Sequence, residues 1–157
     1  METATARPTE LPAGATRPAA ESPSSPLRAW MTRVLWIAAG YNLLAGAGML
    51  CLVHEGYKLL GIEKPELQLP VQLVGMLVAV FGLGYALVAI DPITNRNVLL
   101  LGFLTKLLGP LLALYYVAVG KLPLVFIAVL LVSDLIYLPP FAMILVQLRR
   151  QQRARLA

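Results

Sequence analysis

The chain has 157 residues, of which 59% are hydrophobic and 13% are charged, with a formal net charge of +5 and a mean hydropathy of +0.75. A soluble domain of this length cannot bury so much apolar surface, so the composition excludes an ordinary soluble domain and predicts a multi-pass membrane protein. The basic residues flank apolar segments, and the sequence has no polar domain that could bind a groove of DNA or RNA. Both features argue against a nucleic-acid partner.

A polar segment comes first in the chain. Residues 1–27 contain five prolines among alanine, threonine, serine and glycine, with only scattered leucines. Such a segment cannot bury enough apolar area to offset the entropy of ordering it, so we predict a disordered cytoplasmic tail. The first apolar run begins too late and is too long for a cleaved signal peptide, which predicts a membrane anchor instead.

Four long apolar runs follow, separated by short segments that contain proline, glycine or asparagine. They span residues 34–53, 69–90, 98–119 and 122–146. Each has the ~20 residues that an α-helix needs to cross ~30 Å of hydrocarbon, and none alternates like a strand of a membrane barrel. The prediction is an all-α integral membrane bundle of four transmembrane helices over residues 28–148, followed by a basic cytoplasmic tail at residues 149–157.

Lysine and arginine are divided unevenly between the two ends of the predicted helices. Nine of them lie near the two termini or in the loop at Arg96, whereas Lys58, Lys64 and Lys121 lie in the other two loops. Cytoplasmic segments of membrane proteins carry an excess of basic residues. We therefore predict that both termini are cytoplasmic.

The second run carries a stripe of small residues, Gly75, Ala79, Gly82 and Ala86, at spacings that place them on one face of a helix. Small side chains let a neighbouring helix approach closely. The neighbour can belong to the same chain or to a second copy, so the stripe predicts either intrachain packing or a homodimer.

Lys106 in the third run and Asp134 in the fourth are the two charged residues deep inside the apolar runs. A charge at mid-membrane costs ~2.5 to 3.5 kcal/mol on a translocon scale, so such a residue is expected to have an ion-pair partner or a function. A tight turn at Gly120 and Lys121 makes the two helices antiparallel neighbours, and both charges lie about 14 positions, or ~20 Å, from its centre. We predict that Lys106 and Asp134 lie at the same depth and form an ion pair.

Two further residues are assigned to this intramembrane polar site. Asn42 in the first run lies at a similar depth and can donate to Asp134 or accept from Lys106. For Asn42 alone, the alternative is an ordinary interhelical hydrogen bond. Tyr137 is the fourth member of the predicted site.

Three prolines are predicted to kink the helices around the same layer. Pro110 cannot donate to the carbonyl of Lys106, and Pro139 and Pro140 release the carbonyls one turn before them. The site therefore has two interpretations. It is either a neutral clip that fixes helix order and register, or a site for a ligand, a proton or an ion.

The single cysteine and the single histidine limit other chemistry. They exclude an intramolecular disulfide, a cysteine-based metal site, the paired-histidine zinc motif and a haem held by two histidines of one chain. We predict no metal, no catalytic residue and no cofactor from these residues.

Three segments resemble those of known membrane proteins: Gly102–Pro110, Gly120–Pro123 and Asp134–Phe141. They resemble a group of small bacterial four-helix inner-membrane proteins with no assigned activity and, more distantly, the DoxX-like proteins. The resemblance covers about residues 34–146 and rests on the Lys-x-x-Gly-Pro and Asp-Leu-Ile segments. It implies a place in the bacterial inner membrane and a redox role with a quinone, although this chain lacks cysteine pairs and evident cofactor ligands.

Three hypotheses for the function follow. The leading one is a non-enzymatic membrane protein, either an accessory subunit of a membrane complex or a small-ligand-binding bundle organised around Lys106 and Asp134. Its partners would be the lipid bilayer and either another membrane protein or a second copy. The alternatives are a small dimeric proton-coupled transporter, in which Asp134 exchanges the proton, and a DoxX-like redox or quinone-associated component.

Overall fold

The computed structural model describes residues 27–156 of the chain. Of the segment predicted to be disordered, residues 1–26 lie outside the described residues. Leu27, the last residue of that segment, is described and is buried in the hydrophobic core. The described residues thus begin two positions before the first span, Ala29–Cys51.

All regular elements of residues 27–156 are helices. In chain order they are α1 (Ala29–Cys51), α2 (Val53–Leu60), α3 (Leu69–Ile90), α4 (Arg96–Ala118), α5 (Val125–Ser133), the 3-10 helix η1 (Leu135–Tyr137) and α6 (Leu138–Leu156). Four stretches are long and apolar enough to cross a membrane: Ala29–Cys51, Leu69–Ile90, Arg96–Ala118 and Val125–Ala154. The predicted all-α fold with four membrane spans is confirmed, and the chain is a multi-pass membrane protein.

The fourth span is not the single continuous helix predicted over residues 122–146. It consists of α5, η1 and α6, with the break at Asp134, whose backbone φ of −131° and ψ of −55° leave the helical region. Pro139 and Pro140 lie in the first turn of α6, where a backbone N–H has no acceptor within the helix. The prolines therefore begin a new helix after the break, and α6 continues through the predicted basic tail to Leu156.

Helix α2 is an element that the sequence analysis did not predict. Val53, Tyr57 and Leu60 recur at helical spacing and are buried or half-buried. The helix ends at Gly61, which has a φ of +65°, and the N–H of the next residue, Ile62, donates to the carbonyl of Tyr57 over 3.1 Å. This is a glycine-terminated helix end, and it turns the chain back toward α3.

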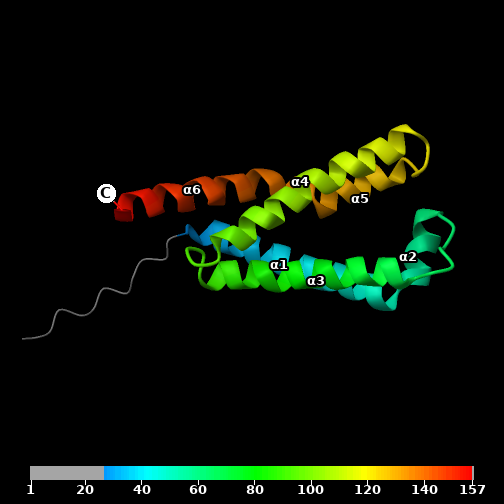
Figure 1. Cartoon of the computed structure of the whole chain (residues 1–157), viewed down its shortest axis with the longest axis horizontal. Helices are drawn as coiled ribbons and strands as arrows, with labels where there is room; N and C mark the ends of the chain where they lie inside the picture. Colours follow the sequence, from blue (N-terminus) through cyan, green and yellow to red (C-terminus); the bar gives the residue numbers. More distant parts are fainter. Residues whose placement is uncertain (1–26, 157) are drawn as a thin grey trace, which may run out of the picture.

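Helices α1 and α3 lie side by side along most of their length (Figure 1). A methyl group built on Gly46 of α1 would lie 2.5 Å from the carbonyl oxygen of Gly75 and 2.8 Å from Cβ of Ala79. A methyl group on Gly82 would lie 2.9 Å from the carbonyl oxygen of Ala39. The small residues of α3 thus allow backbone-to-backbone contact with α1, within one chain.

Helix α4 packs against both α3 and α6, and so connects the α1–α3 pair to α6 (Figure 1). Its Gly102 leaves room for the ring of Tyr85 from α3, because a methyl group there would lie 2.5 Å from the tyrosine hydroxyl oxygen. At the end of the bundle where α4 begins, the side chain of Arg96 donates to that of Gln152 in α6. These contacts fix α4 between the α1–α3 pair and α6.

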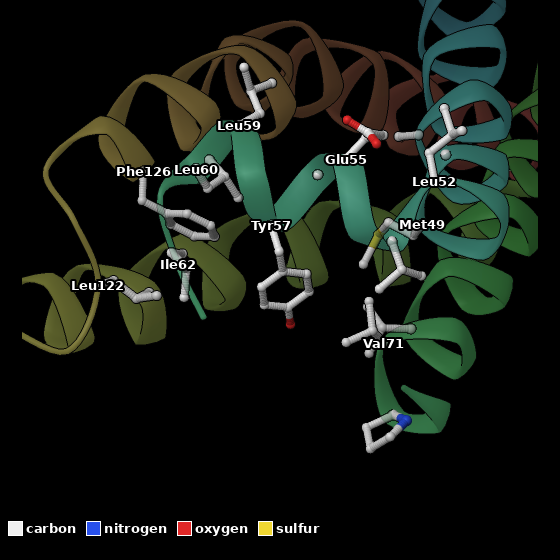
Figure 2. Close-up of a pocket in the computed structure, with 16 residues that line it drawn as sticks. Met49, Leu52, Glu55, Tyr57, Leu59, Leu60, Ile62, Val71, Leu122 and Phe126 are labelled. Atoms are coloured by element: carbon white, nitrogen blue, oxygen red, sulfur yellow. The ribbon is translucent and has the colours of Figure 1, made fainter. Parts of the chain in front are cut away.

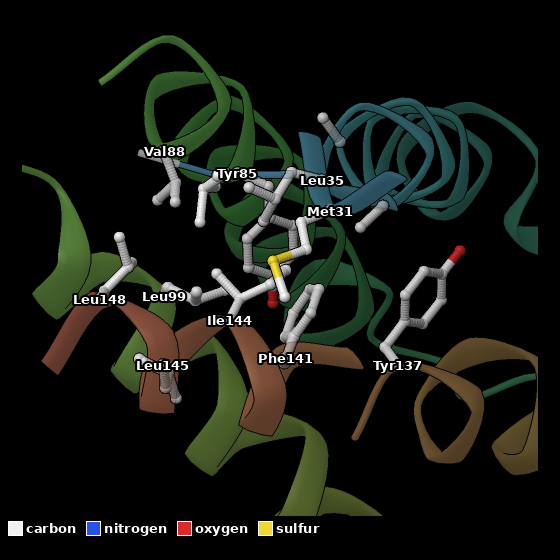
Figure 3. Packing of buried hydrophobic residues seen from close by; sticks show 13 residues of the cluster. Met31, Leu35, Tyr85, Val88, Leu99, Tyr137, Phe141, Ile144, Leu145 and Leu148 are labelled. Atoms are coloured by element: carbon white, nitrogen blue, oxygen red, sulfur yellow. The ribbon is translucent and has the colours of Figure 1, made fainter. Parts of the chain in front are cut away.

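The core lies in the half of the bundle that contains the start of α1, the end of α3 and α6. Figure 3 shows its side chains meeting from α1, α3, α4, η1 and α6. Its fully buried members include Leu35, Tyr85, Leu99, Phe141 and Ile144. Many large apolar side chains elsewhere on the spans are exposed, as expected for surfaces that face lipid.

Candidate functional site

The buried ammonium group of Lys106 is the centre of the candidate site. Lys106 extends from the middle of α4, and its side chain is only 6% exposed. Its Nζ atom donates to Oδ1 of Asp134 over 3.1 Å and to the backbone carbonyl of Ser133 over 2.6 Å. The ring of Tyr137 lies on another side of it, with its centroid 5.0 Å from Nζ. The predicted intramembrane ion pair is confirmed.

The carboxylate of Asp134 is held from two directions. One oxygen accepts from Lys106, and the other accepts from the hydroxyl of Ser133 over 2.6 Å. The Asp134 side chain is 26% exposed, so the pair is asymmetric: the ammonium is enclosed, whereas the carboxylate keeps one accessible side. Any molecule that reaches this pair meets the carboxylate first.

The break in the fourth span supplies the second acceptor of Lys106. In a continuous helix the carbonyl of Ser133 would accept from the N–H of Tyr137. Here the N–H of Tyr137 donates instead to the carbonyl of Asp134 over 3.1 Å, in the tighter 3-10 pattern. The Ser133 carbonyl is therefore available to the lysine, and a buried polar group that the break would have left unpaired is satisfied.

Aromatic rings of the hydrophobic core extend to the ion pair. The ring of Tyr137 lies 6.1 Å from that of Tyr41 in α1 and 5.8 Å from that of Phe141 in α6, measured between centroids. Phe141 in turn packs edge-on against Tyr85 of α3 at 5.0 Å. This row of rings joins α1, η1, α6 and α3, and it limits the dielectric constant around Lys106 on the core side.

Comparisons of the chain with protein-family models, with curated proteins and with solved structures give no match. The chemistry of the site follows from the residues of this chain. They show a multi-pass membrane protein with a buried Lys106–Asp134 pair at the break of its fourth span.

The other residues predicted for the site are placed differently. Asn42 is buried in α1, but among residues 27–156 it forms no hydrogen bond with Lys106 or Asp134. Pro110 is buried inside α4, which runs through it as one helix. Tyr137, in contrast, lies against the ammonium group. The structure thus brings together Lys106, Asp134 and Tyr137 and leaves Asn42 out of their hydrogen bonds.

Ser133 is the member of the site that the sequence analysis missed. It contributes both a carbonyl to Lys106 and a hydroxyl to Asp134. The signal was present, because a serine directly before an intramembrane aspartate is a local hydrogen-bond donor to the carboxylate. Its carbonyl could not have been found this way, because its availability depends on where the helix breaks.

Within the part of the chain that the structure describes, no group of three or more His, Cys, Asp or Glu residues is close enough to hold a metal ion. The arrangement instead provides a compensated pair of charges with four hydrogen-bonding or cation–π contacts. Such a group can hold helices together, and its carboxylate is 26% exposed.

Proposed function

We propose that this protein is a non-enzymatic binding component of the membrane, a helical frame in which the Lys106–Asp134 pair acts as a clip between α4 and the broken fourth span. The observation that carries this proposal is the enclosure of the ammonium group by internal partners, since the Lys106 side chain is only 6% exposed. Asp134, the Ser133 carbonyl and the Tyr137 ring surround it. A lysine that served as a nucleophile or a general base would need a free direction toward its substrate.

The clip would stabilise the break between α5 and α6. Helix α5 has nine residues and is about 14 Å long, so it cannot cross the membrane without α6. The break between them would act as a hinge if its backbone groups were unpaired. By binding Ser133 and Asp134 at the break, Lys106 fixes the angle between α5 and α6 and attaches both to α4.

We also propose that both termini face the cytoplasm, because the basic residues divide nine to three between the two sides. The location in a bacterial inner membrane, and the DoxX-like redox role with a quinone, remain hypotheses that rest on the motif resemblance.

A second candidate function is proton-coupled transport. It is favoured by the exposed side of Asp134 at a broken membrane helix, since interrupted helices line the binding sites of many transporters. In this case Asp134, beside the Lys106 ammonium, would be the proton-carrying group.

The experiment that tests the clip is a double-mutant cycle in mild detergent, with Lys106→Leu, Asp134→Leu and the double variant. Asp134→Leu leaves an uncompensated buried ammonium and is expected to cost about 3–5 kcal/mol of unfolding free energy, whereas Lys106→Leu leaves a carboxylate that is 26% exposed and should cost less. The double variant should be less destabilised than either single variant. Lys121→Leu, which removes an exposed lysine at the α4–α5 turn, is the matched control and should have little effect.

Additive costs without coupling energy would contradict the clip, because residues that do not interact show no coupling. The transport alternative has a separate readout. The native protein would be reconstituted in vesicles with an internal pH-sensitive dye and an imposed pH gradient. Proton flux that is lost in Asp134→Leu would establish transport, whereas no flux above protein-free vesicles supports the binding component.

A further inference from the structure

A second site lies at the opposite end of the bundle from the hydrophobic core. It is a cavity of about 760 Å³ between the end of α1, α2, the start of α3 and the beginning of α5. Figure 2 shows Phe126 of α5 beside Leu60 and Ile62, across the cavity from Met49 and Val71 of α1 and α3. The volume is in the range of small-molecule binding sites, roughly 300–1,000 Å³.

The shape of the fold explains why the cavity exists. The clip at Lys106 and Asp134 holds the middle of α4 and the break of the fourth span, while toward their shared turn α4 and α5 diverge from α1 and α3 (Figure 1). Helix α2 rises from the end of α1 toward that turn. The cavity lies between these elements, and only Leu122 and Phe126 line it from the α4–α5 side.

The position of the cavity places it at the boundary between hydrocarbon and water. Ala45, Met49 and Val74 belong to membrane spans, whereas α2 and the following loop carry charged residues. The cavity is also open on one side. A molecule that occupies it can therefore have one end among the spans and the other end at the level of the charged loop.

The lining excludes water as a stable occupant and favours hydrocarbon. Almost every lining side chain is apolar, and a buried water needs two to four polar partners. The surrounding medium of a membrane protein offers hydrocarbon tails at high concentration. A tail already lies in hydrocarbon, so what it gains in the cavity is van der Waals contact with these side chains, about 0.1–0.2 kcal/mol for each pair of carbon atoms.

The polar end of the occupant is indicated by the one charged residue of the lining. Glu55 on α2 is the one charged residue among the described residues that line the cavity. A head group with a primary amine would complement this carboxylate by a charge-assisted hydrogen bond. An anionic head group without an amine would lack this hydrogen bond.

We propose that this cavity binds one hydrocarbon tail of an amine-bearing membrane lipid, with the tail between α1, α3 and α5 and the amine at Glu55. The proposal rests on the proposed function in one respect, since it identifies the class of molecule that the frame binds. The ion pair does not line the cavity, so the two proposals fail separately: the double-mutant cycle tests the clip, and lipid occupancy tests the cavity.

Two glycines allow the cavity to be filled without disturbing the backbone. Gly48 on α1 and Gly56 on α2 both line it, and a Cβ atom at either position meets no atom within 4 Å. Gly48→Leu and Gly56→Leu therefore place a side chain into the open space. The matched control is Gly40→Leu, because Gly40 lies on α1, has the same open surroundings and does not line the cavity.

The experiment uses full-length protein in phosphatidylcholine vesicles that contain a trace of phosphatidylethanolamine with a photoactivatable diazirine in its acyl chain. After illumination, crosslinked peptides are mapped by mass spectrometry. We expect crosslinks to concentrate on Met49, Val74 and Phe126 and to fall several-fold in each cavity-filling variant but not in Gly40→Leu. The same probe with a phosphatidylglycerol head should label these residues several-fold less, and Glu55→Gln should remove that preference.

Labelling spread evenly over the lipid-facing residues, such as Leu44 and Leu77, and unchanged by Gly48→Leu and Gly56→Leu would overturn the proposal, because it would show only the ordinary lipid shell. Equal or stronger labelling by the phosphatidylglycerol probe would overturn the assignment of the amine to Glu55. Using two filling variants on different helices keeps the test valid if one of them fails to insert.

Discussion

The contact between α1 and α3 leads to a quantitative prediction for Gly46→Ala. The new methyl carbon would lie 2.5 Å from the carbonyl oxygen of Gly75, 2.7 Å from the backbone nitrogen of Ala79 and 2.8 Å from its Cβ. Unstrained carbon contacts are ~3.5–4.0 Å long, so the two helices must separate by about 1 Å at this point. None of the three atoms is the end of a flexible side chain that could move aside.

The expected cost is about 1–3 kcal/mol, the usual range for extra methylenes in a packed interior. A gap of 0.5–1 Å forfeits a quarter to a half of the dispersion energy of the atom pairs on either side, which adds to the strain. Gly75→Ala is expected to cost a similar amount, because its methyl group would lie 2.7 Å from Cβ of Met49. The double variant should cost less than the sum, since one separation of the helices relieves both clashes.

The assay is equilibrium unfolding in mixed micelles with increasing SDS, followed by circular dichroism. Gly48→Ala and Gly40→Ala, on the same helix with open space around the new methyl group, are the controls. They should be neutral or more stable by up to ~1 kcal/mol, because alanine favours a helix over glycine. If Gly46→Ala matches these controls, α1 and α3 do not pack through Gly46, and the reasoning is refuted.

Four further outcomes are expected. Alkaline phosphatase fused after Ala157 should be inactive and a fusion at Lys64, in the loop that follows α2, active, because the basic residues favour cytoplasmic termini; the reverse pattern would refute the topology. Deletion of residues 1–25 should leave membrane yield and thermal stability unchanged, because their composition provides little apolar area to bury, and a large loss of either would show that the tail packs on the bundle. Gly102→Ala should destabilise the protein by about 1–3 kcal/mol in the same SDS assay, because its methyl group overlaps the ring of Tyr85, and no loss would place α3 and α4 further apart. Tyr85→Phe should be neutral or stabilising, because the buried hydroxyl forms no well-aligned hydrogen bond among the described residues; a loss above ~1 kcal/mol would show that it bonds to a neighbour such as the Thr105 hydroxyl.

The spans and the ion pair could be predicted from sequence because both depend on simple counting. Hydrophobic length decides which segments cross the bilayer, and the observed helix α3 begins and ends at the predicted residues 69 and 90. The depth of Lys106 and Asp134 follows from the number of residues to the turn at Gly120, which has a φ of +69° and ends α4. The rotation of each helix about its own axis cannot be obtained by counting residues in this way.

Helix α2 escaped prediction for a different reason. It is eight residues long and carries His54, Glu55 and Lys58, so hydropathy averaged over the length of a span does not separate it from the loop. Its regular spacing of Val53, Tyr57 and Leu60 was the available signal. That signal matters for function, because α2 forms one wall of the proposed lipid site.

The break in the fourth span shows why the site as a whole could not be derived from local sequence. Pro139 and Pro140 prevent an ordinary helix from continuing, but they do not determine which carbonyl upstream becomes available. In the structure that carbonyl belongs to Ser133, and the group that satisfies it is Lys106, 27 positions earlier in the chain. The break and the lysine therefore depend on each other, because an orphaned carbonyl inside the membrane needs a donor and a buried ammonium needs acceptors. The ion pair can be predicted from the two opposite charges in the sequence. The contact between Lys106 and the Ser133 carbonyl cannot, because it forms only when α4 packs against the fourth span.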